Sequence, residues 1–119
     1  MCIRDSNYSV GQVVSSSIYF AGGGGASTQG GGGTGGSGGY GGGGAGTSSV
    51  GAGTSGTANT GGGGGAGYNA FNGGNGGSGV VILSMPTTNY SGKTTGSPIV
   101  TTNGSNTVLI YTSSGSYIA

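Results

Sequence analysis

The stretch from residue 21 to residue 79 constrains the fold of this chain more than any other feature. It holds 31 of the 36 glycines, and it contains no charged residue, no proline and no cysteine. Glycine in a helix interior costs about 1 kcal/mol relative to alanine, so an α-helix is excluded here. A conventional β-strand is disfavoured as well, because glycine has no side chain to pack on the pleated surface. Any packing within this tract must therefore come from the backbone itself.

Parts of the tract repeat with a period of three residues. Thr34, Ser37 and Tyr40 close three successive Gly-Gly-X triplets, and Asn75 and Ser78 repeat the pattern. Polyproline II geometry has three residues per turn, so side chains at this spacing share one edge and leave the other two edges bare. Bare edges allow neighbouring backbones to hydrogen-bond. The spacing predicts a sandwich of parallel and antiparallel polyglycine II helices.

Two alternatives stay open for the tract at this point, a disordered linker and loosely paired strands. Chains rich in glycine and serine behave as flexible coils. Ordering one residue costs about 1–2 kcal/mol of backbone entropy, whereas one hydrogen bond returns only about 0.5–1.5 kcal/mol net. A strict collagen triple helix is disfavoured, because glycine is not held at every third position and the tract has no proline.

Polar segments interrupt the glycine runs and are predicted to form loops. They lie at Ala26–Gln29, Thr47–Thr60 and Tyr68–Asn72, and serine and asparagine are typical turn residues. Tyrosine, serine, glycine and asparagine are also the residue types of adaptable recognition loops. The candidate receptor contacts are therefore Tyr40, Tyr68, Asn69, Phe71 and Asn72. The alternative is that these aromatic side chains only seal the ends of the sandwich.

Residues rich in β-branched and aromatic side chains flank the tract and predict strands. In residues 7–20 the candidate strands are Val13–Val14 and Ser17–Phe20. Residues 80–119 predict a small antiparallel β unit of three or four strands, with Thr87–Ser97 as a loop. Its expected strands are Val80–Met85, which Pro86 ends, Ile99–Thr102, Asn106–Thr112 and Tyr117–Ala119. The predicted fold class is thus mainly β and irregular, with no α-helix.

The side chains present offer little material for a reaction centre. The only charged residues are Arg4, Asp5 and Lys93, and there is no histidine. This inventory lacks the ligands of a metal site and the groups of acid–base catalysis. Glycine patterns of the dinucleotide-binding type occur, but no helix or acidic residue follows them. We therefore expect no enzyme activity, cofactor or metal. A net charge of +1 provides no electrostatic basis for binding nucleic acid, so we expect no nucleic-acid partner. No apolar run is long enough to span a membrane, so we expect no membrane insertion.

Met1–Ser6 resembles a translated sequencing adapter of the kind found at the start of metagenomic reading frames. Such segments are excluded from fold reasoning. The exclusion removes the only cysteine, the only arginine and the only acidic residue, and it leaves Lys93 as the one charged side chain. We also expect an upstream part of the native protein to be missing.

Four segments resemble the glycine-rich domain family of bacteriophage tail and receptor-binding proteins. Gly76–Leu83 resembles the closing strand of the family, although Ser84-Met85-Pro86 follows where the family often has a basic residue. The other segments are Ser16–Gly25, Thr57–Gly65 and Thr94–Ala119, the last of which resembles the C-terminal extension of marine phage and metagenomic members. The resemblance implies a virion component in which polyglycine helices present variable receptor-binding loops, and it implies no catalytic residues.

The expected function is a non-enzymatic, adhesin-like structural component of a phage tail fibre, located in the virion tail. The loops would contact a host cell-surface receptor, either a glycan or an outer-membrane protein. Other tail proteins and further copies of the chain are the remaining expected partners. Two alternatives stay open: a secreted bacterial surface or matrix protein, and an ice-binding protein, against which the irregular X residues argue.

Overall fold

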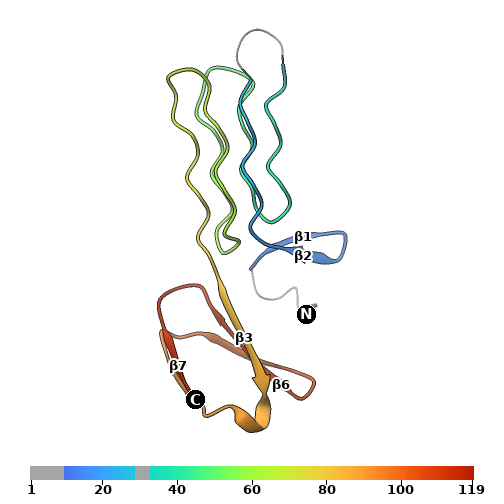
Figure 1. Cartoon of the computed structure of the whole chain (residues 1–119), viewed down its shortest axis with the longest axis vertical. Helices are drawn as coiled ribbons and strands as arrows, with labels where there is room; N and C mark the ends of the chain where they lie inside the picture. The colour runs from blue at the N-terminus through green and yellow to red at the C-terminus, as the bar shows by residue number, and fades with distance from the viewer. Residues whose placement is uncertain (1–9, 29–32) are drawn as a thin grey trace. The chain divides into compact units, whose positions relative to one another are not determined.

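The computed structural model describes residues 10–28 and 33–119 (Figure 1). Met1–Ser6 and Gln29 lie outside the described residues. The chain divides into two compact units, Met1–Gly79 and Val80–Ala119, and each is considered by itself. The described residues form seven short β-strands and one 3-10 turn, and none of them lies in an α-helix. This confirms the predicted mainly β and irregular fold class.

An antiparallel hairpin precedes the glycine-rich tract. It consists of β1 (Gln12–Val14) and β2 (Ser17–Tyr19). Ser15 and Ser16 connect the strands with φ angles of 47° and 66°, as a two-residue hairpin turn of the primed type requires. The predicted strands are confirmed here, except that Phe20 lies beyond the end of β2.

The glycine-rich tract forms six extended segments that run up and down beside one another (Figure 1). In chain order they cover residues 21–28, 33–39, 42–47, 51–57, 61–68 and 72–78, and we call them segments a to f. Backbone bonds join b to c and c to d in one layer, and a to e and e to f in the other. Further bonds connect the layers, so the tract is a two-layered sandwich.

Hydrogen bonds between these segments recur at every third residue. The amides of Gly22 and Gly25 in segment a donate to the carbonyl oxygens of Gly41 and Gly44, at 3.0 and 2.8 Å. A β-ladder repeats every two residues along the strand, whereas a period of three residues is that of the polyproline II helix. The segments are therefore polyglycine II helices, as the Gly-Gly-X triplets predict.

The sandwich also contains a repeat that the sequence analysis did not predict. Donor and acceptor positions differ by 19 in the bonds from a to c, from c to e and from d to f, for example between the Gly44 amide and the Gly63 oxygen. The described residues of the tract thus follow a 19-residue repeat, whose copies span 22–40 (without 29–32), 41–59 and 60–78. The repeat is hard to recognise in the sequence because a chain so rich in glycine resembles itself at many offsets.

Two of the predicted loops lie partly in polyglycine II segments, and one turn lies where no loop was predicted. Ala26 belongs to segment a, because its oxygen accepts a bond from the Gly36 amide at 2.7 Å. The predicted loop Thr47–Thr60 contains segment d. Conversely, the glycine run after Tyr40 turns sharply at Gly41 and Gly42, where φ is 100° and 86°. Glycine serves both the straight segments and this turn, so the sequence does not mark the difference.

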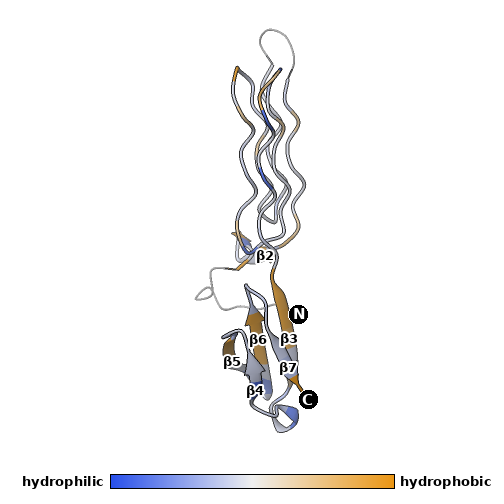
Figure 2. Ribbon diagram, turned by 90° about the vertical axis from the view of Figure 1, so that its left-hand side faces the viewer, coloured by the Kyte–Doolittle hydropathy of each residue, from blue (hydrophilic) through white to orange (hydrophobic). Residues whose placement is uncertain are grey.

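The second unit contains two small antiparallel sheets. The larger has the strand order β3-β6-β5, and the smaller pairs β4 with β7. Their bounds are β3 Val81–Pro86, β4 Lys93–Thr95, β5 Ile99–Asn103, β6 Asn106–Tyr111 and β7 Ser116–Ile118. The central strand β6 carries the core, because Thr107–Tyr111 are all buried and Leu109 has no exposed surface. Figure 2 shows the hydrophobic colour concentrated on β3, β5 and β6.

Three details of this unit differ from the sequence prediction. Pro86 is the last residue of β3 and does not stand beyond it, which is tolerated because β3 is an edge strand that needs no donor on its outer side. Thr87–Ser97 is not simply a loop, since it holds the 3-10 turn η1 (Thr87–Asn89) and β4. The unit therefore has five strands where three or four were expected. β4 was missed because Lys-Thr-Thr has no apolar residue to signal a strand.

Candidate functional site

The loops of the sandwich lie at its two ends, because consecutive segments run in opposite directions. We call the end beside β1 and β2 the hairpin end, and it carries the turns at 39–42 and 58–60. The opposite end, which we call the distal end, carries the turns at 48–51 and 68–72. The two ends offer different side chains.

The predicted receptor contacts are divided between these two ends. The distal end brings together Tyr68, Asn69, Phe71 and Asn72, which share one turn. Tyr40 lies at the hairpin end, where its ring is 5.5 Å from the ring of Tyr19. The five predicted residues therefore do not form a single surface.

The two distal turns are tied to each other through the backbone. The Tyr68 amide donates to the Gly51 oxygen, and the Gly53 amide donates to the Asn72 oxygen, both at 3.0 Å. Within the second turn, the Phe71 amide donates to the oxygen of Tyr68 at 3.1 Å. These bonds fix the positions of the two turns relative to each other.

Side-chain and backbone conformations reinforce the distal turns. The Thr47 hydroxyl donates to the Ser49 oxygen at 2.9 Å and accepts from the Ser49 amide at 3.3 Å, which closes a local turn. Asn69 has a φ of 54°, a left-handed conformation that asparagine adopts more readily than most residues. The loops are therefore preorganised.

Two apolar side chains stand out from this preorganised end. Val50 is 70% exposed and Phe71 is 49% exposed. The sequence predicts Phe71, but not Val50, as a receptor contact. The only sequence signal for Val50 was that it is an isolated β-branched residue within a run of serine and glycine. We define the distal surface as Val50, Tyr68, Asn69, Phe71 and Asn72.

The hairpin end is capped by a polar side chain. The Oε1 atom of Gln12 accepts hydrogen bonds from the amides of Gly41 and Gly42, at 2.8 and 3.1 Å. These are the amides exposed by the sharp turn, so Gln12 satisfies donors that the sandwich leaves unpaired. Gln12 therefore has a structural role at this end.

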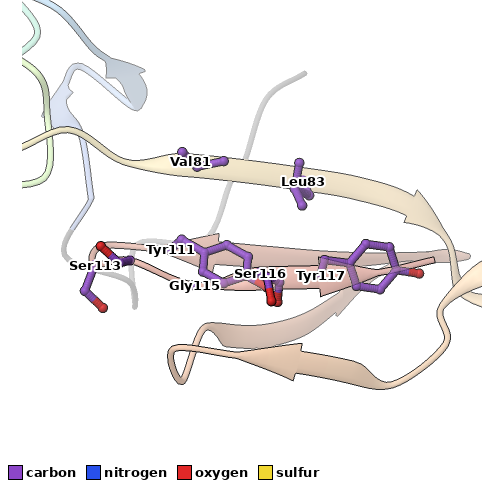
Figure 3. Close-up of a pocket in the computed structure, with 8 residues that line it drawn as sticks. Val81, Leu83, Tyr111, Ser113, Gly115, Ser116 and Tyr117 are labelled. Carbon is purple, nitrogen blue, oxygen red and sulfur yellow. The ribbon is translucent and has the colours of Figure 1, made fainter.

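A pocket of about 230 Å³ lies in the second unit (Figure 3). It opens between β3 and the chain that leads from β6 into β7. Its lining residues are Val81, Leu83, Tyr111, Ser113, Ser114, Gly115, Ser116 and Tyr117. Sequence reasoning did not predict this pocket, because its two walls lie far apart in the chain and carry no motif.

Tyr111, at the inner wall of this pocket, carries a perturbed phenol. Desolvation by burial, followed by the neighbouring Tyr90 phenol, raises the pKa of Tyr111 above its ordinary value of 10.0. The Tyr111 hydroxyl donates to the Ser116 oxygen at 2.8 Å, a bond that only the protonated form can make.

We expect the stability of the second unit to fall at alkaline pH because of Tyr111. Its pKa is higher in the folded chain than in the unfolded chain, so the stabilisation is fully present below about pH 10 and is lost as the pH rises further. Tyr111→Phe removes the proton and this contribution. Unfolding midpoints of both proteins, measured by circular dichroism from about pH 8 to about pH 11, test the prediction, and an equal fall in both proteins would contradict it.

A family model described as a glycine-rich domain matches residues 4–86. The match covers the whole sandwich and continues through β3. The chain belongs to this glycine-rich domain family. No curated protein and no solved structure matches it. In this glycine-rich domain protein, residues 87–119 lie beyond the matched part.

The described part of the glycine-rich domain protein holds no helix that is both long and apolar enough to cross a membrane. Within residues 10–28 and 33–119, no three histidine, cysteine, aspartate or glutamate side chains gather as a metal site would need. The exposed side chains of the distal surface and the pocket of the second unit are the features with potential for recognition.

Proposed function

We propose that this glycine-rich domain protein is a non-enzymatic, adhesin-like structural component of a phage tail fibre. Its sandwich is a scaffold, and its distal surface contacts a receptor on the host cell. The observation that carries the proposal is the exposure of Val50 and Phe71 on turns that are hydrogen-bonded to each other.

The scaffold suits this role because its interior contains almost no side chains. Buried glycines line it, and Gly22, Gly25, Gly44, Gly62 and Gly65 are among them. Backbone bonds at every third residue fix each segment against its neighbours. A support of this kind can tolerate changes in its loops, because the packing of the sandwich does not depend on their side chains.

The distal surface has the chemistry of an adaptable contact. Tyrosine and phenylalanine supply large contact areas at a low entropic cost, and asparagine and serine supply hydrogen bonds. No charged residue occurs between residues 21 and 79, so the contact depends on shape, aromatic packing and hydrogen bonds. A glycan or a protein loop at the cell surface would satisfy these requirements.

Adsorption of the purified full chain to bacterial cells tests the proposal. We expect the labelled protein to bind outer membranes of a host strain, and we expect Phe71→Ala to weaken binding about tenfold or more, as loss of an aromatic hot spot does. Phe20→Ala is the matched control, because Phe20 is 38% exposed and follows β2 toward the hairpin end. Circular dichroism confirms that each variant is folded.

The same series decides between the two ends. Tyr40→Ala removes a side chain that is 66% exposed at the hairpin end, and we expect it to leave adsorption unchanged. If Tyr40→Ala abolishes adsorption while Phe71→Ala does not, the contact lies at the hairpin end. If folded protein adsorbs to no strain from which related phages can be isolated, the adhesin role is wrong.

A further inference from the structure

The pocket of the second unit is bordered on its inner side by a continuous sheet face formed by β3 and β6. Val81 and Leu83 alternate along β3 and therefore share one face. In the sheet register Val81 lies opposite Tyr111 of β6. Figure 3 shows Val81 and Leu83 on one side of the pocket and Tyr111, Ser116 and Tyr117 on the other.

The outer wall is folded back over this face and held there. A Cβ atom on Gly115 would come within 2.6 Å of the Tyr111 ring, so the backbone packs directly on the aromatic ring. The Tyr111 hydroxyl binds the Ser116 oxygen at 2.8 Å, which anchors the start of β7. The pocket is thus preorganised.

The second aromatic wall is equally well fixed. The Tyr117 hydroxyl donates to the Asn89 oxygen at 3.1 Å and accepts from the Ser91 amide at 3.2 Å. Its ring stacks on Tyr90, with the centroids 5.9 Å apart and the planes 20° from parallel. The hydroxyl of Tyr117 is therefore engaged on the protein side, and its ring borders the pocket.

The lining combines apolar walls with a hydroxyl rim. Two aliphatic and two tyrosine side chains form the walls, and the exposed Ser113 and Ser114 lie at the rim. No charged residue lines the pocket, since Lys93 is absent from the lining. The volume of about 230 Å³ falls below the roughly 300–1,000 Å³ of pockets for drug-sized ligands. The lining therefore suits a small, uncharged occupant that has an apolar face and hydrogen-bonding groups at its edge.

We propose that this pocket binds a single ring of a neutral saccharide. The C–H face of a pyranose packs on aliphatic and aromatic side chains, and its hydroxyl groups reach the serine rim. The site lies entirely within residues 80–119, so it does not depend on the proposed role of the distal surface. It gives the second unit a recognition function of its own.

Nuclear magnetic resonance titration of the full chain with methyl glycosides of glucose, galactose, mannose and N-acetylglucosamine tests the proposal. We expect at least one glycoside to shift the amide signals of Leu83, Tyr111 and Ser113–Tyr117, with a dissociation constant on the order of 1 mM, as a ligand of this size allows. Indole serves as the purely apolar probe and is expected to bind more weakly.

Val81→Ala and Val100→Ala form a matched pair of variants. Both valines are on edge strands of the same sheet, at 57% and 45% exposure, but only Val81 lines the pocket. We expect Val81→Ala to weaken glycoside binding roughly 3- to 10-fold, because it removes apolar contact area, and Val100→Ala to leave it unchanged. Equal affinities in the two variants, tighter binding of indole than of every glycoside, or no shift at the lining residues would each overturn the proposal.

Discussion

Gly64→Ala is expected to destabilise the polyglycine sandwich strongly. A Cβ atom at Gly64 would lie 1.9 Å from the Gly74 oxygen and 2.4 Å from the Gly74 carbonyl carbon. Both are backbone atoms of segment f, so no flexible side chain can move aside. Relief requires the two segments to separate, which breaks bonds such as that from the Gly74 amide to the Gly65 oxygen.

The expected size of this effect follows from typical stabilities. Overpacking alone costs about 1–3 kcal/mol, and each broken bond adds about 0.5–1.5 kcal/mol. We therefore expect the free energy of unfolding to fall by about 3 kcal/mol or more, a large part of the roughly 5–15 kcal/mol of a typical domain. Thermal unfolding of the full chain followed by circular dichroism and amide signals measures the loss.

Gly23→Ala is the matched control for Gly64→Ala. A Cβ atom at Gly23 meets nothing within 4 Å, and Gly23 is not among the residues with a positive φ. The substitution restricts the unfolded chain without a clash, so we expect stabilisation by about 0.4–1 kcal/mol. If Gly64→Ala and Gly23→Ala have the same stability, the interior of the sandwich is not packed backbone against backbone.

The sequence predicts the type of secondary structure in the tract better than its topology. The spacing of Thr34, Ser37 and Tyr40 indicates a helix with three residues per turn, and the backbone bonds have that period. The turn at Gly41 and Gly42 was invisible, because glycine is suitable both for close packing and for a positive φ. Turns were predicted correctly only where other residue types mark them, as in Tyr68–Asn72.

The second unit shows a related limit. β3, β5 and β6 carry apolar side chains and were predicted close to their observed bounds. β4 has none, and what fixes it is its pairing with β7, where the Ser116 amide donates to the hydroxyl of Thr95 at 3.0 Å. Such a pairing joins segments about 20 residues apart, and local propensity does not encode it.

The candidate sites show the same contrast between features marked by residue type and features that depend on the topology of the fold. Tyr68, Asn69, Phe71 and Asn72 were selected from the sequence because recognition loops have a characteristic composition, and the structure places these four residues on one turn. The location of Tyr40 at the other end could not be predicted without the direction of each segment. The pocket beside Tyr111 depends on the sheet register and on the return of Gly115 over β6, and neither can be read from composition.

The two units bury different groups, and this difference predicts a second large loss of stability. The sandwich buries peptide groups, whereas the second unit buries the side chains of a single strand, β6. A mutation that removes one aliphatic side chain should therefore matter far more in the second unit. Leu109 is the sharpest test, because it has no exposed surface and lies between Leu83 of β3 and Val100 of β5.

Leu109→Ala is expected to lower the free energy of unfolding of the second unit by about 2–5 kcal/mol, the range for a buried leucine that leaves a cavity. A unit of 40 residues has little stability in reserve, and a loss of this size lowers the unfolding midpoint of a small domain by roughly 10 °C or more. We therefore expect the amide signals of β3, β5 and β6 to lose their dispersion at about 37 °C, below the usual midpoints of such domains. Val100→Ala removes an exposed valine opposite Leu109 and should cost less than about 0.5 kcal/mol, as most surface substitutions do. If the two variants retain the same dispersion and the same unfolding midpoint, β6 is not the core of this unit, because a buried and an exposed side chain would then contribute equally.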